Sequence, residues 1–237
     1  MKNPYFPNRR GFTLLETVIA IGVLAVLLSG FMLVFTPAAE GIRKSINVQQ
    51  ADRLTTTLEQ QLTTVPANET TTYPTGFDKA FAWIKESSSA SNALIVYQYR
   101  GDFSAPRTDG TPTPVATIGN KLPGKDFVVV SMVRRKGDSN LAADLAALEG
   151  PVYVVKCTQL VYNNGEMKLG TAGEIKDPKN GTPAANADAY PEAVISFSAD
   201  FYQMPSTSPG YLTGDAFNKK FATLKTPVFS RNLGVRR

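Results

Sequence analysis

An uninterrupted apolar run near the N-terminus constrains this chain more than any other feature. Val18 to Phe35 spans 18 residues without a charged side chain. As a helix this run would extend roughly 27 Å at 1.5 Å per residue, near the lower limit for crossing a bilayer. A basic segment ending in Arg9-Arg10 precedes it. We therefore expect a helix held in a membrane or in the core of an assembly, with the basic segment on the cytoplasmic side.

A single carboxylate, Glu16, lies near the start of the apolar run. An isolated charge in hydrocarbon is costly, and a chain that keeps one usually supplies a partner for it. We therefore expect a positive group close to Glu16 in the working form of the protein.

The residues GFTLLETVIAIGVL at positions 11–24 resemble the N-terminal signature of type IV prepilins and of the pseudopilins of type II secretion. The resemblance implies that a prepilin peptidase cuts after Gly11 and that the new N-terminal residue, Phe12, is N-methylated. It also implies that Glu16 serves subunit assembly, opposite the amine of a neighbouring subunit. The similarity covers residues 9–65 and is specific only at 11–24.

Two other interpretations explain part of this segment. A secretory signal peptide also has a basic region followed by an apolar one, and Pro37-Ala38-Ala39 could serve as its cleavage site. Its apolar run is normally shorter and lacks a glutamate. A plain single-pass anchor explains the apolar run, but it does not explain the Gly-Phe-x-x-x-Glu spacing.

The net charge of +5 comes largely from the leader. Lys2, Arg9 and Arg10 are three of the 25 basic residues, so removing residues 1–11 leaves 22 against 20 acidic ones. No nucleic-acid partner is indicated, and we expect the cluster Arg134-Arg135-Lys136 to be solvated at a strand end.

The remaining composition argues against an enzyme. The chain has no histidine, the commonest general base and metal ligand, and no Walker, dinucleotide or nucleophile-elbow motif. We expect no cofactor and no metal. A calcium loop is the one weak candidate, and we expect its residues to be solvated instead: Asp177, Asn180, Asp188 and Glu192. The single cysteine, Cys157, lies in an apolar run and is expected in the core.

Residues 12–65 are predicted to form one long helix. Its first half is apolar on all faces. Pro37 removes one backbone hydrogen bond and is expected to kink it. The second half is amphipathic, with apolar residues at three- and four-residue spacing: Ile42, Ile46, Ala51, Leu54, Leu58, Leu62 and Val65. We expect this stripe to lie across one face of a sheet.

Several strands follow the helix. The composition and alternation predict strands at 93–99, 127–133, 152–162, 166–169 and 193–202. Asn163-Asn164-Gly165 predicts a hairpin turn between the third and fourth of them. Short helices are expected at 78–86, 141–149 and 215–224, a long loop at 101–124, and mostly loop from Met204 onwards.

This order predicts an α+β fold, type IV pilin-like in the terms of the resemblance. The expected parts are a prepilin leader at 1–11, a membrane or filament-core half-helix at 12–36, an amphipathic half-helix at 37–65 and a globular domain at 66–237.

The function these features favour is a pilin-like or pseudopilin subunit, processed after Gly11 and assembled into a pilus or secretion pseudopilus. Its length and long loops favour a minor or specialised subunit. The expected partners are prepilin peptidase, other pilin or pseudopilin subunits and the bacterial inner membrane, with the globular domain outside the cytoplasm. The alternative is a membrane-anchored binding or adhesion module that forms no filament.

Overall fold

The computed structural model describes residues 13–67, 69–163 and 165–237. Its contacts divide the chain into two units, one ending at Gln49 and one beginning at Gln50. Helix α1, Leu14–Thr63, contributes to both units and continues through Pro37 as a helix. The predicted long N-terminal helix is therefore confirmed. The leader, with Gly11 and Phe12, lies outside the described residues.

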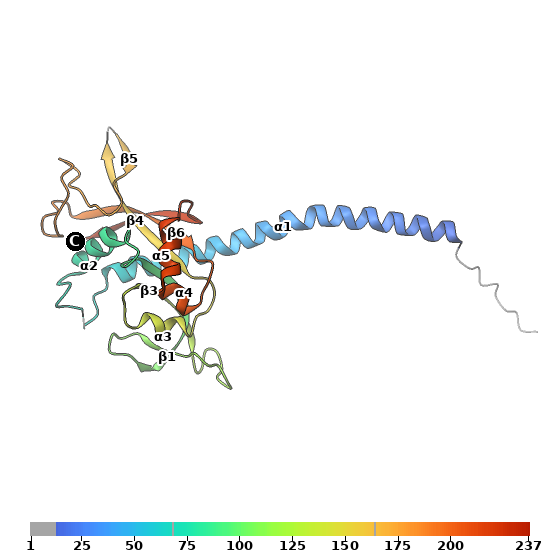
Figure 1. Cartoon of the computed structure of the whole chain (residues 1–237), viewed down its shortest axis with the longest axis horizontal. Helices are drawn as coiled ribbons and strands as arrows, with labels where there is room; N and C mark the ends of the chain where they lie inside the picture. The colour runs from blue at the N-terminus through green and yellow to red at the C-terminus, as the bar shows by residue number, and fades with distance from the viewer. Residues whose placement is uncertain (1–12, 68, 164) are drawn as a thin grey trace, which may run out of the picture. The chain divides into compact units, whose positions relative to one another are not determined.

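Within the described residues of the second unit, seven strands form one antiparallel sheet (Figure 1). Its main path runs β2-β1-β4-β6-β7, with β3 paired to β1 and β5 paired to β4. The strands are β1 (Leu94–Pro106), β2 (Pro112–Pro114), β3 (Val128–Arg135), β4 (Tyr153–Asn163), β5 (Glu166–Leu169), β6 (Val194–Gln203) and β7 (Phe229–Arg236).

The strands β1 and β4 overlap only briefly and then diverge. Leu94–Val96 pair with Tyr153–Val155. Because the two strands are antiparallel, the rest of β1 runs toward one end of the sheet and the rest of β4 toward the other. Figure 1 shows β5 and the far part of β1 at these opposite ends.

One face of the sheet is covered by the end of α1 and by α2, the two helices that precede the strands in the chain. The end of α1 places Leu54, Leu58 and Leu62 in this core layer, each at most 3 % exposed. Helix α2, Gly76–Glu86, adds its apolar side, on which Phe77, Phe81, Trp83 and Ile84 are buried. Thr75 begins α2 with a capping box to Asp78, which satisfies backbone donors of the first turn.

The opposite face of the sheet is covered by three short helices, α3 (Leu141–Leu145), α4 (Pro209–Thr213) and α5 (Asp215–Ala222). Successive residues of β1 therefore alternate between two buried layers, with Leu94 and Val96 in one and Ile95 and Tyr97 in the other. The continuous apolar run of this strand follows from burial on both faces.

Two predictions about loops are wrong. The segment 101–124 was expected to be a loop, but β1 continues to Pro106 and β2 follows it. The tail was also expected to be mostly loop, yet β7 pairs along eight residues with β6, from Val194↔Arg236 to Phe201↔Phe229. The predicted strand at 166–169 and its antiparallel pairing with β4 are confirmed.

Candidate functional site

The N-terminal candidate site is described only from Thr13 onwards. Glu16 lies in the first turn of α1. Its Oε2 is 3.5 Å from the Thr13 backbone nitrogen and 3.4 Å from Thr13 Oγ1, while the Glu16 backbone nitrogen donates to Thr13 Oγ1 at 3.2 Å. These contacts form a loose capping box, which sequence reasoning missed although the Thr-x-x-Glu spacing is its signal.

The capping box gives the Glu16 carboxylate a contact within its own chain. Within its own chain it faces the start of the helix, where the first backbone N–H groups carry partial positive charge. The side chain is nevertheless exposed along this segment, so its oxygens stay accessible to a neighbour. Glu16 is therefore oriented by its own helix before any partner arrives.

The apolar part of α1 offers a continuous exposed surface. Its large side chains are 52–84 % exposed between Leu14 and Phe35. In the part of the chain that the structure describes, the segment Leu14–Ala39 is long and apolar enough to cross a membrane. The hydroxyl of Ser29 donates to the Ala25 carbonyl at 2.8 Å, so this polar group is satisfied inside the helix. This surface suits a membrane or the packed core of an assembly.

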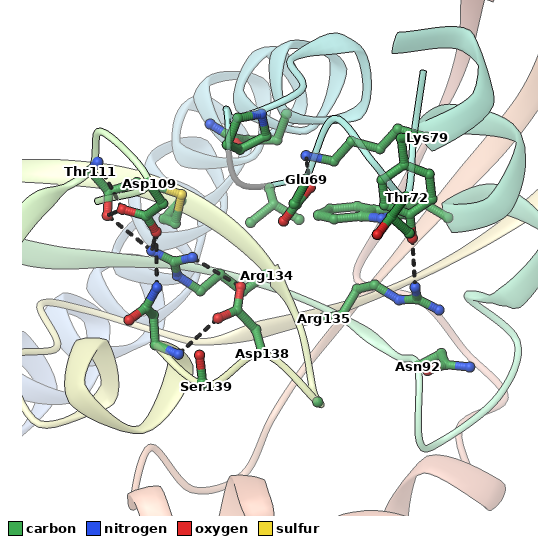
Figure 2. A pocket seen from close by; sticks show the side chains of 18 residues that line it. Glu69, Thr72, Lys79, Asn92, Asp109, Thr111, Arg134, Arg135, Asp138 and Ser139 are labelled. Carbon is green, nitrogen blue, oxygen red and sulfur yellow. Dashed lines mark hydrogen bonds and ion pairs between the residues drawn. The ribbon is translucent and has the colours of Figure 1, made fainter. Parts of the chain in front are cut away.

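A second candidate is a polar pocket of about 410 Å³ in the sheet domain. Figure 2 shows two groups of charged side chains along it, Arg134 with Asp109 and Asp138, and Lys79 with Glu69. The pocket is lined by residues from six parts of the second unit: the end of α1, the 66–73 segment, α2, the end of β3, and the 109–111 and 137–140 loops.

Arg134 is the centre of the first group. Its Nη2 is 2.9 Å from Asp109 Oδ2, its Nη1 is 2.9 Å from Asp138 Oδ2, and its Nε is 2.7 Å from Asp144 Oδ2. Asp144 is fully buried and also accepts from Arg107 Nη2 at 2.6 Å and from the Tyr97 hydroxyl at 2.5 Å. The expectation that the cluster at 134–136 is solvated is therefore wrong for Arg134, which is 6 % exposed.

The electrostatics of this network favour a charged Asp109, a charged Arg134 and a neutral Tyr97. Burial alone would raise the pKa of Asp109, but hydrogen bonds from Thr111 and the Arg134 guanidinium outweigh it and lower that pKa to about 2. Burial likewise opposes the charge of Arg134, yet Tyr97 and the surrounding carboxylates raise its pKa above the ordinary value. Burial, reinforced by Asp144, raises the pKa of Tyr97 well above its ordinary value.

Lys79 is the centre of the second group and is 1 % exposed. Its Nζ donates to the Thr64 carbonyl at 2.8 Å, pairs with Glu69 Oε2 at 3.2 Å and lies 4.4 Å from the centre of the Trp83 ring. Burial lowers the pKa of Lys79, and the nearby Glu69 carboxylate opposes this shift. This lysine ties the end of α1 to α2.

The charged groups of the pocket are thus paired with one another. The pocket walls also hold two buried donors that find no hydrogen-bond acceptor among the described residues, Trp83 Nε1 and Arg135 Nε, and both atoms are sealed from solvent. The Arg134 group fastens Asp109, Asp138 and Asp144 to β3, and the Lys79 group joins Thr64 and Glu69 to α2.

The weak calcium candidates are oriented into their own loop. Asp177 Oδ1 accepts from the Lys179 backbone at 2.8 Å, and Asn180 Oδ1 accepts from the backbone and hydroxyl of Thr182. Glu192 pairs with Lys179 at 3.3 Å. Among the described residues, no group of three or more metal-ligating side chains is assembled.

Cys157 occupies the core, as the sequence predicted. It is 1 % exposed, and burial raises the pKa of its thiol to about 12. Its backbone nitrogen donates to Ser87 Oγ at 2.8 Å, which links β4 to the end of α2. The thiol is therefore a packing group with little thiolate character.

Comparison with protein-family models matches residues 6–32 to the prokaryotic N-terminal methylation motif, the prepilin-type signature. Neither a curated protein nor a solved structure matches the chain significantly. The long apolar helix followed by an antiparallel sheet domain is a mixed α+β arrangement consistent with a pilin-like fold.

Proposed function

We propose that this chain, whose residues 6–32 carry the prepilin-type methylation motif, is a filament subunit of the type IV pilin or pseudopilin kind. The motif is the observation that carries the proposal. It marks substrates of prepilin peptidase, and proteins with this motif are generally structural subunits, not enzymes. Removal of residues 1–11 after Gly11 would expose the Phe12 amine, which is then methylated.

Glu16 is the residue that we assign to assembly. Its carboxylate and the Phe12 amine of a neighbouring subunit carry opposite charges, and neither is stable alone among apolar helices. Pairing them favours docking and fixes the axial position of one helix against the next. The exposed apolar surface of α1 between Leu14 and Phe35 supplies the remaining contact area.

The finer role that we propose is a specialised or minor subunit. The second unit holds seven strands within its described residues and long connecting segments, such as 170–193 between β5 and β6. Such segments commonly carry binding functions. The proposed location is the inner membrane before assembly and a periplasmic pseudopilus or surface pilus afterwards.

Two variants of Glu16 separate its charge from its capping role. Glu16→Gln keeps an acceptor for the capping box but removes the charge, whereas Glu16→Ala removes both. We expect both variants to be processed and held in the membrane, and both to be depleted from the sheared filament fraction, measured by blotting.

If Glu16→Gln enters filaments as well as the unchanged chain, the charge pairing is wrong and only the cap matters. If the unchanged chain itself is never found in a sheared or pelleted filament, the proposed function fails. An anchored binding module would behave in this second way.

A further inference from the structure

Two edge strands of the second unit are open at opposite ends of the sheet. Val128–Ser131 of β3 pair with β1 on one side, and Glu166–Leu169 of β5 pair with β4 on one side. Among the described residues, no backbone hydrogen bond outside these two ladders involves either segment. Each therefore presents a row of unpaired donors and acceptors of about four residues.

The open part of β3 is unusually apolar for an edge. Val128 is 36 % exposed and Val129 is 51 % exposed. Because successive side chains point to opposite faces, Val128 and Val129 lie on different faces of the sheet, and each is at least a third exposed. This edge carries no charge or proline between Val128 and Val133.

The other edges of the sheet are protected in the ways that proteins commonly use. Strand β2 begins and ends with proline, which lacks the backbone donor, and β7 carries Arg231 and Arg236. These features oppose the addition of another strand. The valine edge of β3 lacks them.

Strand β5 is the second open edge, and it is exposed on both of its sides. All four of its side chains are exposed, and its two charges, Glu166 and Lys168, pair with each other at 3.3 Å. The opposite side of the hairpin is apolar, since Tyr162 lies directly across from Met167 and both are more than half exposed. An isolated two-stranded ribbon of this kind is marginal in water and gains from a third strand.

We propose that β5 of one copy adds to the β3 edge of the next copy, which extends the sheet from subunit to subunit. This inference rests on the proposed filament function and on a specialised subunit present in many copies, not on a low-copy minor one, because it requires copies of this chain to stand next to one another. A contact between two different edges is heterologous and can propagate, whereas β3 paired with β3 would close into a dimer. The apolar sides of both segments favour this match.

The two edges cannot meet within one molecule. Val129 pairs with Arg100, four residues beyond Val96, and Met167 pairs with Tyr162, nine residues beyond the position of β4 opposite Val96. At 3.3 Å per residue this places Val129 and Met167 roughly 40 Å apart along the sheet. A short thiol cross-linker that joins them must therefore join two copies.

Cysteine cross-linking of the full-length chain in sheared filaments tests the proposal. The native Cys157 thiol is buried and supplies a silent background. We expect the double variant Val129→Cys/Met167→Cys to give a ladder of multimers with a short bismaleimide, and either single variant to give none. Asn232→Cys, exposed on the protected strand β7, combined with Met167→Cys is the matched control and should give no ladder.

A charge at the open edge gives the second measurement. Val129→Lys should abolish the ladder of a chain with cysteines at 128 and 167, whereas Asn232→Lys should leave it unchanged. The exposed position of Val129 keeps the change in folding small.

Filaments that contain the double variant but give no ladder would overturn the edge contact and leave the filament function standing. A dimer from Val129→Cys alone would show the closed β3 pairing and overturn the proposal as well. Absence of the chain from filaments would remove the proposed function, and this contact with it.

Discussion

Replacing Arg134 by methionine should destabilise the second unit strongly. Methionine retains most of the apolar stem but removes the guanidinium that contacts three carboxylates. The fully buried Asp144 would keep its ion pair with Arg107 and the hydrogen bond from the Tyr97 hydroxyl. Asp109, with a side chain 4 % exposed, would keep only uncharged donors.

The magnitude follows from the burial of these groups. Removing one partner of a buried ion pair costs about 3–5 kcal/mol because the remaining charge stays desolvated. Asp138 is 21 % exposed and can recover water, and Asp144 keeps its ion pair with Arg107, so Asp109 carries most of the cost. Since a domain of this kind is stable by about 5–15 kcal/mol, the variant should lose a large part of its stability.

Urea unfolding of the detergent-solubilised full-length chain measures this loss. The single tryptophan, Trp83, is buried in the second unit and reports on its unfolding by fluorescence. Arg134→Lys keeps a point charge but not the three-way fork, so its loss should lie between those of the unchanged chain and Arg134→Met. Arg236→Met, exposed on β7, is the control and should change the free energy of unfolding by less than about 0.5 kcal/mol. A loss below about 1 kcal/mol for Arg134→Met would refute the idea that this network fastens the loops.

Three further predictions concern the same unit. The pKa of Asp109 is about 2 in the folded chain against an ordinary value of 3.8, so Asp109 contributes about 2 kcal/mol to the free energy of unfolding above pH 4, and this contribution is lost as the pH falls through 2. Unfolding curves at pH 5 and pH 2 should show the loss. The variant Asp109→Asn should show a smaller difference between the two pH values. Cys157, whose thiol pKa burial raises to about 12, should stay unreactive toward a thiol reagent at pH 8 until urea unfolds the chain, and fast labelling of the folded form would contradict its burial. Leu58→Ala, at a fully buried position of α1, should cost about 2–5 kcal/mol in the same urea assay, while Leu27→Ala, 65 % exposed, should leave the tryptophan transition unchanged; equal effects would contradict the packing of α1 on the sheet.

Much of the fold could be predicted from patterns that are local in the sequence. The apolar run and the three- and four-residue spacing predicted α1 because helical periodicity is repeated over many turns. The Asn-Asn-Gly sequence predicted the β4–β5 hairpin because asparagine and glycine tolerate a positive φ, and Gly165 adopts φ 87°. The N-terminal motif is equally local, which is why Gly11, Phe12 and Glu16 could be proposed from the sequence.

Features that depend on distant partners could not be predicted. The burial of Arg134 depends on Asp109 and Asp144, which reach it from separate loops, so its own neighbours in the sequence suggest only a basic cluster. Strand β7 has a polar, weakly alternating sequence, and its place is set by pairing with β6 across eight positions. The Thr13–Glu16 capping box has the Thr-x-x-Glu spacing in the sequence, but the same glutamate also fits a role in pairing with another subunit, so the spacing alone does not assign its local contact.

The mass of the N-terminal peptide of the protein, isolated from the cells that make it, tests the central claim most directly. Processing of a prepilin predicts a chain that begins at Phe12 and carries one methyl group on its amine. An intact Met1, or a chain that begins near Ala39 as after signal-peptide cleavage, would contradict the assignment of this chain as a filament subunit.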